Sequence, residues 1–478
     1  MLKHAIPYCD DSSRLFERIA HLPWPMFLDS GQPKSEYGRF DILVAQPFVT
    51  VTSDEVLDSG RAVIKTEVSQ QGEVTLTEED AFSVLKRLLA AYPVNESSEW
   101  PFAGGALGYF SYDLARQLES LPRLSAADKA CPHMQVGLYD WAVVVDHQEK
   151  TAALVSYGLS ASTHDQWPDL CRLFEAHSSE QRQAVEPTFQ LKAMPSSNMT
   201  FSQYSLAFNK IKAYIKGGDC YQVNLALRFA APAAGNSWLV YKKLRELSPA
   251  PFMAYMKFPS WQILSGSPER FLQVRNRHVE TRPIKGTRPR ALNAIEDAAL
   301  AADLQGSTKD QAENLMIVDL LRNDLGKSCE IGSVQADQLF RLQSFANVHH
   351  LVSIVRGRLA KGKTAIDLLR ACFPGGSITG APKLRSMQII EELEPDRRGV
   401  YCGAIAYIGF DGNMDSNIAI RTAVYREAEQ GDGEMSFYAG GGIVSDSLLD
   451  EEYTEIQDKA SSLLKTMRHF FSDKPATP

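Results

Sequence analysis

Several features that mark particular classes of protein are absent from this chain of 478 residues. Its seven cysteines include no Cys-x-x-Cys pair, so the pattern favours neither a disulfide framework nor a zinc knuckle. No apolar run approaches the roughly 20 residues that a membrane-spanning helix needs. The first residues also lack the apolar core and the cleavage site of a signal peptide. We therefore expect a reduced, cytoplasmic protein with no part embedded in a membrane.

An excess of positive charge is missing as well. Lysine and arginine number 50 against 58 acidic residues, and the formal net charge is −8. A dedicated nucleic-acid binder needs clustered cations, so that class is disfavoured, although a local cationic pocket for a small anion is not. Neither a Gly-x-x-x-x-Gly-Lys-Ser/Thr loop nor a Gly-x-Gly-x-x-Gly fingerprint occurs, which disfavours ATP and NAD chemistry.

The composition that is present suits a globular protein, with 44% hydrophobic and 23% charged residues. Residues 1–180 mix strand-like runs, such as Phe40–Ala45 and Trp141–Asp146, with a helical pattern at Glu79–Ala91. Between His177 and Asn198 the pattern fades into Ser, Gln, Glu and Pro, which is typical of a linker. The sequence thus predicts an N-terminal region, 1–180, and a second region, 195–470, in which the motifs are dense.

Two helices predicted in the second region carry carboxylates in line with their apolar stripes. The first has Asp310 and Glu313 at i, i+3, and the second has Glu452, Glu455 and Lys459 on one face. Two carboxylate pairs suit a hard, oxygen-preferring ion such as Mg²⁺. Alternatively, Glu455 and Lys459 form a surface pair and Asp310 only interacts with a helix N-terminus. Spacing alone leaves both interpretations open.

Two glycine-rich segments also stand out. Pro374–Lys383 runs into a predicted helix, where exposed N–H groups can bind an anion. Ala439–Val444 holds a glycine triplet after a strand, which lets backbone approach a ligand closely. Glycine clusters alone favour the simpler interpretation that both segments are tight turns.

A lysine and a glutamate have sequence contexts that suit chemistry. Lys285 lies between Ile284 and Gly286, and Glu269 precedes it by sixteen residues. A desolvated lysine can act as a nucleophile, and a buried glutamic acid can act as a general acid. A lysine beside arginines is also a common solvated loop residue, so these residues alone do not decide the matter.

Together these motifs resemble the chorismate-binding enzymes, a family that includes anthranilate, aminodeoxychorismate, isochorismate and salicylate synthases. The resemblance spans nearly all of residues 200–465. It implies an α+β fold, an intertwined two-sheet antiparallel β-sandwich with helices on the outside. The matching segments are Gly218–Asn224, Ser267–Phe271, the Lys285 loop, Ala312–Met316, His350–Ser353, Gly380–Lys383, Ile420–Thr422 and the glycine triplet.

The resemblance implies a role for each matching position. Glu313 and Glu455 resemble Mg²⁺ ligands, with Asp310 and Glu452 in companion positions, and Glu269 resembles the general acid/base. Ser377 occupies a substrate-contacting position. The groups that resemble those holding the carboxylates of chorismate are His350, Tyr407, Arg421, Lys459 and the backbone of Gly440, Gly441 and Gly442.

Two positions separate the subfamilies. Water-using relatives carry a lysine where this chain has Gln222, which cannot act as a general base, so ammonia is favoured as the nucleophile. Lys285, in Pro-Ile-Lys-Gly-Thr, resembles the lysine of aminodeoxychorismate synthases that adds covalently to C2 of chorismate, on the route to 4-aminobenzoate and folate. Anthranilate synthase large subunits, the nearest alternative, have alanine there. A non-catalytic, tryptophan-binding regulatory subunit would be expected to lose the acidic residues, and none is lost.

The N-terminal region resembles the part of these enzymes that holds tryptophan. Asp29, Ser30, Phe252 and Met253 are the candidate pocket residues, although ordinary core packing explains them equally well. The sequence contains no candidate glutamine amidotransferase domain. We therefore expect ammonia to come from a glutamine amidotransferase partner in a heterodimer, or from solution.

Overall fold

The computed structural model describes residues 1–31, 38–58, 61–70, 72–94, 98–127, 131–175, 188–344, 348–427 and 433–471. The predicted end of the N-terminal region, at 180, and the first half of the predicted linker lie outside these ranges. Within them, no helix is both long enough and apolar enough to cross a membrane.

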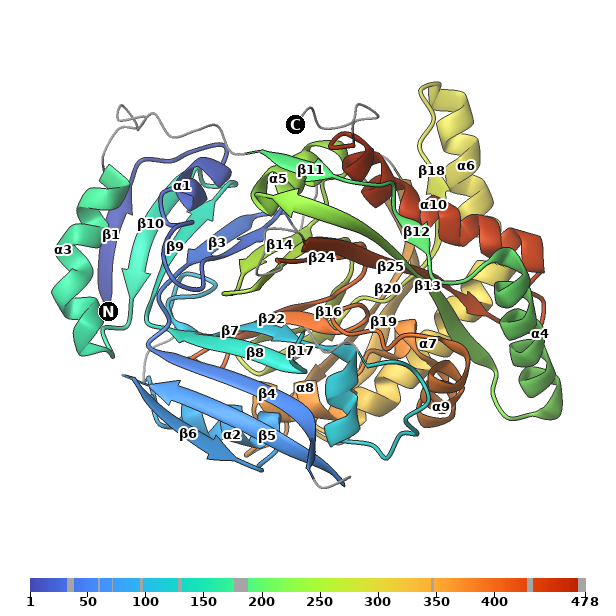
Figure 1. Cartoon of the computed structure of the whole chain (residues 1–478), viewed down its shortest axis with the longest axis horizontal. Coiled ribbons are helices and arrows are strands. Elements are labelled where there is room, and N and C mark those ends of the chain that lie inside the picture. The colour runs from blue at the N-terminus through green and yellow to red at the C-terminus, as the bar shows by residue number, and fades with distance from the viewer. Residues whose placement is uncertain are drawn as a thin grey trace.

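Two large antiparallel sheets form the body of the molecule (Figure 1). The first sheet has the order β1-β10-β9-β3-β2-β14-β15-β24-β25-β13-β11, and β12 and β21 also pair with β13. Its strands are β1 (Leu2–Ile6), β2 (Met26–Asp29), β3 (Phe40–Val44), β9 (Trp141–Asp146), β10 (Thr151–Ser156), β11 (Phe189–Leu191), β12 (Ser196–Ser197), β13 (Gln222–Gly235), β14 (Phe252–Lys257), β15 (Trp261–Ser267), β21 (Gly380–Ala381), β24 (Thr422–Arg426) and β25 (Gly433–Ile443).

The second sheet has the order β18-β20-β17-β16-β23-β22-β7-β8-β4-β5-β6, and β19 also pairs with β20. Its strands are β4 (Val49–Asp58), β5 (Arg61–Gln70), β6 (Glu73–Thr77), β7 (Gly105–Phe110), β8 (Met134–Tyr139), β16 (Arg270–Arg275), β17 (His278–Thr281), β18 (Ile284–Pro289), β19 (Gln335–Ser344), β20 (Val348–Arg358), β22 (Ala404–Gly409) and β23 (Met414–Ile418).

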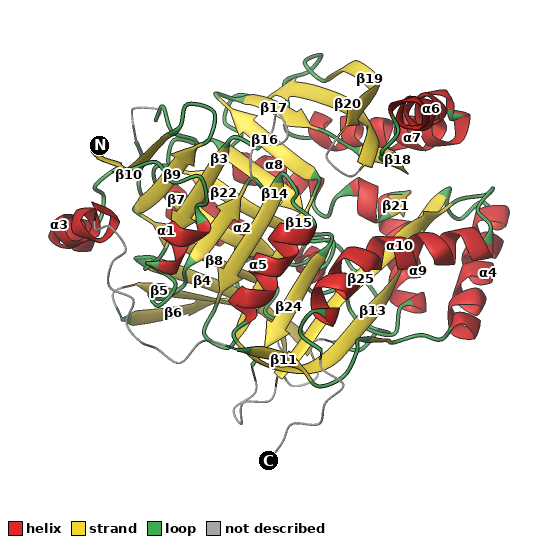
Figure 2. Ribbon diagram, turned by 90° about the horizontal axis from the view of Figure 1, so that it is seen from above, coloured by secondary structure: helices red, strands yellow, loops and turns green. Residues whose placement is uncertain are grey.

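Helices cover the outer faces of these sheets. Figure 2 shows α4, α9 and α10 gathered along β13 and β25, and Figure 1 shows α6 projecting with β18 from the body. The predicted α+β sandwich with outer helices is therefore confirmed. The helices are α1 (Ser13–Glu17), α2 (Ala81–Ala90), α3 (Ala161–Glu175), α4 (Phe201–Gly217), α5 (Ser237–Leu247), α6 (Ala294–Gly306), α7 (Thr308–Gly326), α8 (Ala365–Cys372), α9 (Lys383–Leu393) and α10 (Leu449–Arg468), with short 3₁₀ turns at η1 (Tyr112–Gln117) and η2 (Gly376–Ile378).

Both sequence regions contribute strands to both sheets. β2 pairs with β14 in the first sheet, and β7 pairs with β22 in the second. The hydrophobic clusters likewise draw buried side chains from both regions. The two regions therefore share their cores, and the region boundary in the sequence does not separate two independent sheets.

Two of the crossings of the chain between the sheets, both in the second region, position candidate residues. β15 belongs to the first sheet and β16 to the second, so the chain changes sheet at Pro268–Glu269. It changes back between β23 and β24, where Arg421 has a φ of 49°. These crossings place Glu269 and Arg421 at the junction of the two layers, between strands rather than within them.

Candidate active site

The two crossings are tied directly to each other. The Ile418 N–H donates to the Glu269 carbonyl at 3.0 Å, and the Gly266 N–H donates to the Arg421 carbonyl at 3.0 Å. The Ser267 hydroxyl also donates to the Ile418 carbonyl at 2.6 Å. This backbone frame fixes a carboxyl group and a guanidinium beside one another at the sheet junction.

Glu269 is a buried acid whose protonation is finely balanced. Burial raises the pKa of its carboxyl group to about 7, although a hydrogen bond from Ser377 and the charges of Lys285, Lys459 and Arg421 oppose the rise. The Ser377 hydroxyl donates to Glu269 Oε1 at 2.8 Å. A carboxyl group with such a pKa exchanges protons near neutral pH, as a general acid must.

Cationic groups surround this carboxyl group. The guanidinium of Arg421 has no hydrogen-bond or ion-pair partner among the described residues, and burial lowers its pKa. His350 lies nearby, and burial and the charge of Arg421 lower its imidazole pKa to about 3, so this ring is neutral at physiological pH. The Thr287 hydroxyl is 3.0 Å from His350 Nδ1. A guanidinium without a carboxylate partner is the group that an anionic substrate would pair with.

A set of carboxylates also lies close enough to Lys285 to interact with its positive charge. Burial and the charge of Glu455 both raise the pKa of Glu313 and of Glu452, while Lys285 and Lys309 oppose the rise for Glu313. Glu455 is held by Lys459 at 2.6 Å, and its pKa is lowered by that ion pair. The expected Glu455–Lys459 pair is therefore present, whereas metal binding by these carboxylates stays a prediction.

These carboxylates fit a hard cation in their chemistry. The donors are oxygen atoms, and the like charges of Glu313, Glu452 and Glu455 disfavour one another, which a divalent ion would relieve. In the part of the chain that the structure describes, no three such side chains already converge on one point. Metal binding would therefore have to draw them together, and the Mg²⁺ ligands remain a prediction.

Asp310 has a different neighbour. Arg288 donates to its Oδ2 at 3.4 Å, and the Asp310 charge raises the pKa of Glu313. Gly286 has a φ of +80°, and a Cβ there would come within 2.8 Å of Asp310 Cγ. Lys285 lies in β18 and not in a loop, and this part of the strand can lie against α7 only because glycine follows the lysine.

The glycine triplet lies between these groups on β25. Lys459 Nζ donates to the Gly440 carbonyl at 3.1 Å, and a Cβ on Gly441 would meet Glu452 Oε2 at 3.1 Å. On the other face of the strand, a Cβ on Gly442 would come within 2.6 Å of Gln222 Nε2. The triplet thus lets a carboxylate and an amide approach the backbone from opposite faces.

Gln222 and Asn224 are buried amides with unpaired atoms. Within the described residues, neither amide atom of Gln222 has a hydrogen-bond partner, and Asn224 Oδ1 has none. A buried polar atom without a partner is costly, so such a cluster usually marks a place where a ligand or water binds.

Tyr407 does not join the predicted substrate group. It extends from β22 toward the other side of the sheet, where its hydroxyl accepts a hydrogen bond from Arg275. The alternation of side chains along a strand, which sequence matching does not resolve, decides this direction. Tyr407 therefore moves from the predicted chorismate contacts to a separate cavity.

That cavity, called the intersheet cavity here, has a volume of about 610 Å³. β2, β3 and β14 line it from the first sheet, and β16, β20, β22 and β23 from the second. Of the four predicted tryptophan-pocket residues, Asp29, Phe252 and Met253 line it, whereas Ser30 turns away and donates to Asp41 Oδ1 at 2.8 Å. Core packing alone therefore does not explain this region.

Sequence reasoning missed two residues that the structure brings into these sites. The positive charge of Lys309 lowers the pKa values of Glu313, Glu452 and Glu455. Lys309 lies four residues before Glu313 on the same helix, and this spacing is the sequence signal that could have identified it. Arg275 enters the intersheet cavity through strand pairing, for which no local signal exists.

The site combines the buried acid Glu269, the lysine Lys285 whose charge acts on it, and the guanidinium of Arg421, which has no carboxylate partner. Together these groups define an enzyme site for an anionic substrate. The sequence matches the model of the chorismate binding enzyme family over residues 32–465, and the chain belongs to that family.

Several curated proteins are similar along most of the chain. Aminodeoxychorismate synthase component 1 of Salmonella typhimurium is 44% identical over 462 residues, which cover 96% of each chain. Anthranilate synthase component 1 of Geobacillus stearothermophilus is 36% identical over 91% of this chain and 87% of that protein. Among solved structures, anthranilate synthase component I from Streptococcus pneumoniae superposes with a TM-score of 0.76 at 31% identity, covering 90% of this chain and 93% of that chain.

Proposed function

We propose that this chain is the chorismate-binding component of an aminodeoxychorismate synthase, which converts chorismate and ammonia to 4-amino-4-deoxychorismate. The observation that carries the proposal is Lys285, whose charge acts on both Glu269 and Glu313. Anthranilate synthases, the alternative, resemble this chain in the other site residues but have alanine at the Lys285 position. The similarity to proteins named aminodeoxychorismate synthase component 1 supports the same choice.

Substrate binding follows from the cationic groups. We assign one carboxylate of chorismate to Arg421, because this guanidinium lacks a partner among the described residues. Ser377 lies at the same junction, where it contacts Glu269. The neutral ring of His350 adds no charge beside Arg421.

The covalent step uses Lys285 and Glu269 together. The neutral Lys285 amine forms a bond to C2 of chorismate while both conjugated ring double bonds shift and the C4–O bond breaks. Glu269, protonated near neutral pH, gives its proton to the departing hydroxyl, which leaves as water. Ammonia then bonds to C4 and loses a proton to Glu269, both double bonds shift back, and the C2–N bond to Lys285 breaks, so the neutral lysine and the acid are regenerated and the enolpyruvyl group stays in place.

A magnesium ion is the proposed cofactor, with Glu313 and Glu455 as ligands and Glu452 and Asp310 behind them. When bound, it would neutralise the ring carboxylate of chorismate and ease departure of the C4 hydroxyl. The residues of the chain do the remaining work, which is to hold the substrate and to move the proton at Glu269.

Ammonia is the proposed nucleophile, supplied by a separate glutamine amidotransferase subunit. The name component 1 among the relatives supports a partner component. Gln222 and Asn224 offer unpaired amide atoms that can accept N–H groups of ammonia, and neither can deprotonate water. Tryptophan binding in the intersheet cavity and a cytoplasmic location remain predictions.

Product identification tests the proposal. The purified chain is incubated with chorismate, Mg²⁺ and an ammonium salt at alkaline pH, and the products are separated by liquid chromatography with mass detection. The expected product keeps the enolpyruvyl group and carries NH₂ in place of OH. Anthranilate plus pyruvate would instead favour the anthranilate synthase alternative.

The same assay applied to variants tests whether the lysine determines the product. Lys285→Ala removes the proposed nucleophile. The matched control is Lys363→Ala, which changes an exposed lysine in the loop between β20 and α8 and should leave both the rate and the product unchanged.

A further inference from the structure

A buried ion pair lies next to two segments of the catalytic site and takes no part in the proposed reaction. Arg398 Nη2 donates to Glu394 Oε1 at 2.7 Å, and Arg398 Nε donates to Glu394 Oε2 at 2.9 Å. The exposed fractions of the two side chains are only 1% and 3%. Glu394 directly follows α9, and Arg398 lies four residues further along the chain.

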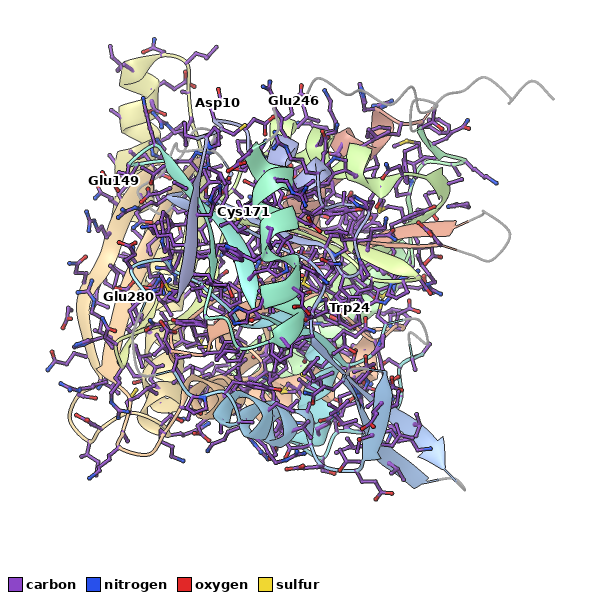
Figure 3. The ribbon with its side chains drawn as sticks, turned by 90° about the vertical axis from the view of Figure 1, so that its left-hand side faces the viewer. Asp10, Trp24, Glu149, Cys171, Glu246 and Glu280 are labelled. Carbon is purple, nitrogen blue, oxygen red and sulfur yellow. The ribbon has the colours of Figure 1, made fainter. Side chains whose placement is uncertain are left out.

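This pair differs from the ion pairs at the surface of the molecule. Glu149 and Glu246, labelled in Figure 3, are exposed and pair with basic side chains near solvent, where such pairs contribute little to stability. Burying both charges costs desolvation energy, so a buried pair is weak evidence for stability. A carboxylate at the C-terminal end of a helix is also disfavoured by the helix dipole. Stability therefore does not account for the Arg398–Glu394 pair.

The guanidinium of Arg398 links two segments of the site. Its Nη1 donates to the Ile378 carbonyl at 2.9 Å, and its Nη2 donates to the Asn224 carbonyl at 3.0 Å. Ile378 is the last residue of η2, and Asn224 belongs to β13. The Asn224 N–H also donates to the Thr379 carbonyl at 2.9 Å. One planar group thus fixes the position of η2 relative to β13.

Glu394 holds this guanidinium in place and also contacts β13. Its Oε1 accepts a hydrogen bond from the Ala226 N–H at 2.9 Å as well as the one from Arg398. The guanidinium carbon lies 4.9 Å from the centre of the Tyr112 ring and 5.8 Å from the centre of the Tyr401 ring. These contacts come from different segments, so they leave the guanidinium little freedom to rotate.

η2 carries the residue that contacts the proposed general acid. Ser377 directly precedes Ile378, and its hydroxyl donates to Glu269 Oε1 at 2.8 Å. A hydrogen bond weakens steeply as its geometry departs from the ideal, so a small displacement of η2 would weaken this bond. The position of the Ser377 hydroxyl therefore depends on the contacts that Arg398 makes.

We propose that Arg398 is a positioning residue, which holds η2 so that the Ser377 hydroxyl donates to Glu269, and that Glu394 fixes the guanidinium in this orientation. Arg398 is not assigned a contact with the substrate, and it acts through Ser377. The catalytic consequence rests on the proposed function, in which Glu269 is the general acid. The effect on the Glu269 carboxyl group can be measured without turnover.

Direct titration of Glu269 in the full chain tests the proposal. The carboxylic acid band of Glu269 in the infrared spectrum is followed across pH without substrate, and its loss in Glu269→Gln assigns it. Ser377→Ala is expected to raise the pKa of Glu269 by at least about one unit, because the lost bond favours the ionised form. Arg398→Lys is expected to raise it by about half a unit, because lysine keeps the charge but lacks the planar fork that holds both carbonyls.

A combined variant shows whether Arg398 acts through the serine. In the Ser377→Ala background, Arg398→Lys should cause no further shift. The control is Arg116→Lys, because Arg116 is a buried arginine that pairs with Glu391 of α9 but, among the described residues, donates to neither η2 nor β13. It should leave the pKa of Glu269 unchanged. A wild-type pKa in folded Arg398→Lys, or a further shift of the same size in the Ser377→Ala background, would overturn the proposal.

A second variant keeps the test decisive if Arg398→Lys does not fold. Arg398→Met combined with Glu394→Gln removes two opposite charges together and keeps an oxygen atom for the Ala226 N–H. The Ile378 and Asn224 carbonyls then lack the guanidinium, so the pKa of Glu269 should rise by at least about half a unit. A folded double variant with the wild-type pKa would refute the positioning role.

The pH profile of the reaction separates this inference from the proposed function. In variants that raise the pKa of Glu269, the alkaline limb of kcat/KM for chorismate should move up by the same amount. A shift in the titration without a shift of the limb would support the positioning role and would contradict the assignment of Glu269 as the general acid. The other groups that face Glu269 are unchanged in these variants, and they are Lys285 on β18, Lys459 on α10, Arg421 between β23 and β24, and Cys402 before β22.

Discussion

The hydrogen bond from Ser377 to Glu269 provides a direct test of the acid assignment. The hydroxyl donates at 2.8 Å to a carboxyl group whose pKa is about 7, and this bond favours the ionised form. Hydrogen bonds to charged groups contribute about 1.5–3 kcal/mol. One pKa unit corresponds to about 1.4 kcal/mol, so losing the bond should raise the pKa by at least about one unit.

The sign of the effect follows from the role of Glu269. A general acid must be protonated, so activity falls as the pH rises through the pKa of its carboxyl group. In Ser377→Ala, the alkaline limb of kcat/KM for chorismate should therefore move up by about one pH unit. The assay follows product formation across pH at a constant concentration of free ammonia, because ammonium itself titrates in this range.

Two further variants make this prediction specific. Ser377→Thr keeps a hydroxyl and should keep the limb near its original position. Ser53→Ala removes another buried hydroxyl, which contacts Thr66 and Gln117 on the N-terminal strands, and should leave the profile unchanged. An alkaline limb that stays in place or moves down in Ser377→Ala would refute the reasoning, and a shift of the acidic limb instead would identify Glu269 as a base.

Three more outcomes can be checked on the same purified protein. Glu269→Gln should raise the free energy of unfolding at alkaline pH and leave it unchanged at acid pH, as measured by urea unfolding at both pH values. The reason is that folding raises the pKa of Glu269 from 4.5 to about 7, so ionisation of this carboxyl group at alkaline pH destabilises the wild type by up to about 3 kcal/mol. Glu313→Ala should abolish Mg²⁺-dependent turnover. The control is Asp319→Ala, which changes an exposed residue of the same helix and should show the wild-type dependence of activity on magnesium concentration. Lys285→Ala should lose or greatly slow aminodeoxychorismate formation and can shift the product toward anthranilate; an unchanged rate and product would remove the covalent step.

Local signals in the sequence were enough for the helices that carry the site. The Thr200-Phe-Ser-Gln203 sequence is typical of a capping box, and α4 begins there and ends before Gly218, which has a φ of 82°. The sequence predicts helices over residues 308–324 and 450–470, and α7 and α10 follow these ranges closely, because apolar periodicity and helix ends depend on neighbouring residues. Pro382 suits the first position of a helix, but it directly precedes α9.

For the strands, local sequence patterns did not predict which sheet each strand joins. The apolar pattern predicts one strand near residues 262–275 and another near 417–425, but each of these ranges contains a crossing from one sheet to the other. Hydrophobic alternation reports that a segment is extended, and it does not report which sheet the segment joins. The crossings are the places where Glu269 and Arg421 meet.

The sequence by itself determined the family, because motifs for a shared chemistry survive as short ordered strings. Tertiary structure alone decided which side chains face the junction and which face the intersheet cavity. Tyr407 and Ser30 turned away from their expected sites, and Arg275 entered the cavity without a sequence signal. The physical reason is that strand pairing between residues far apart in the chain sets the direction of each side chain.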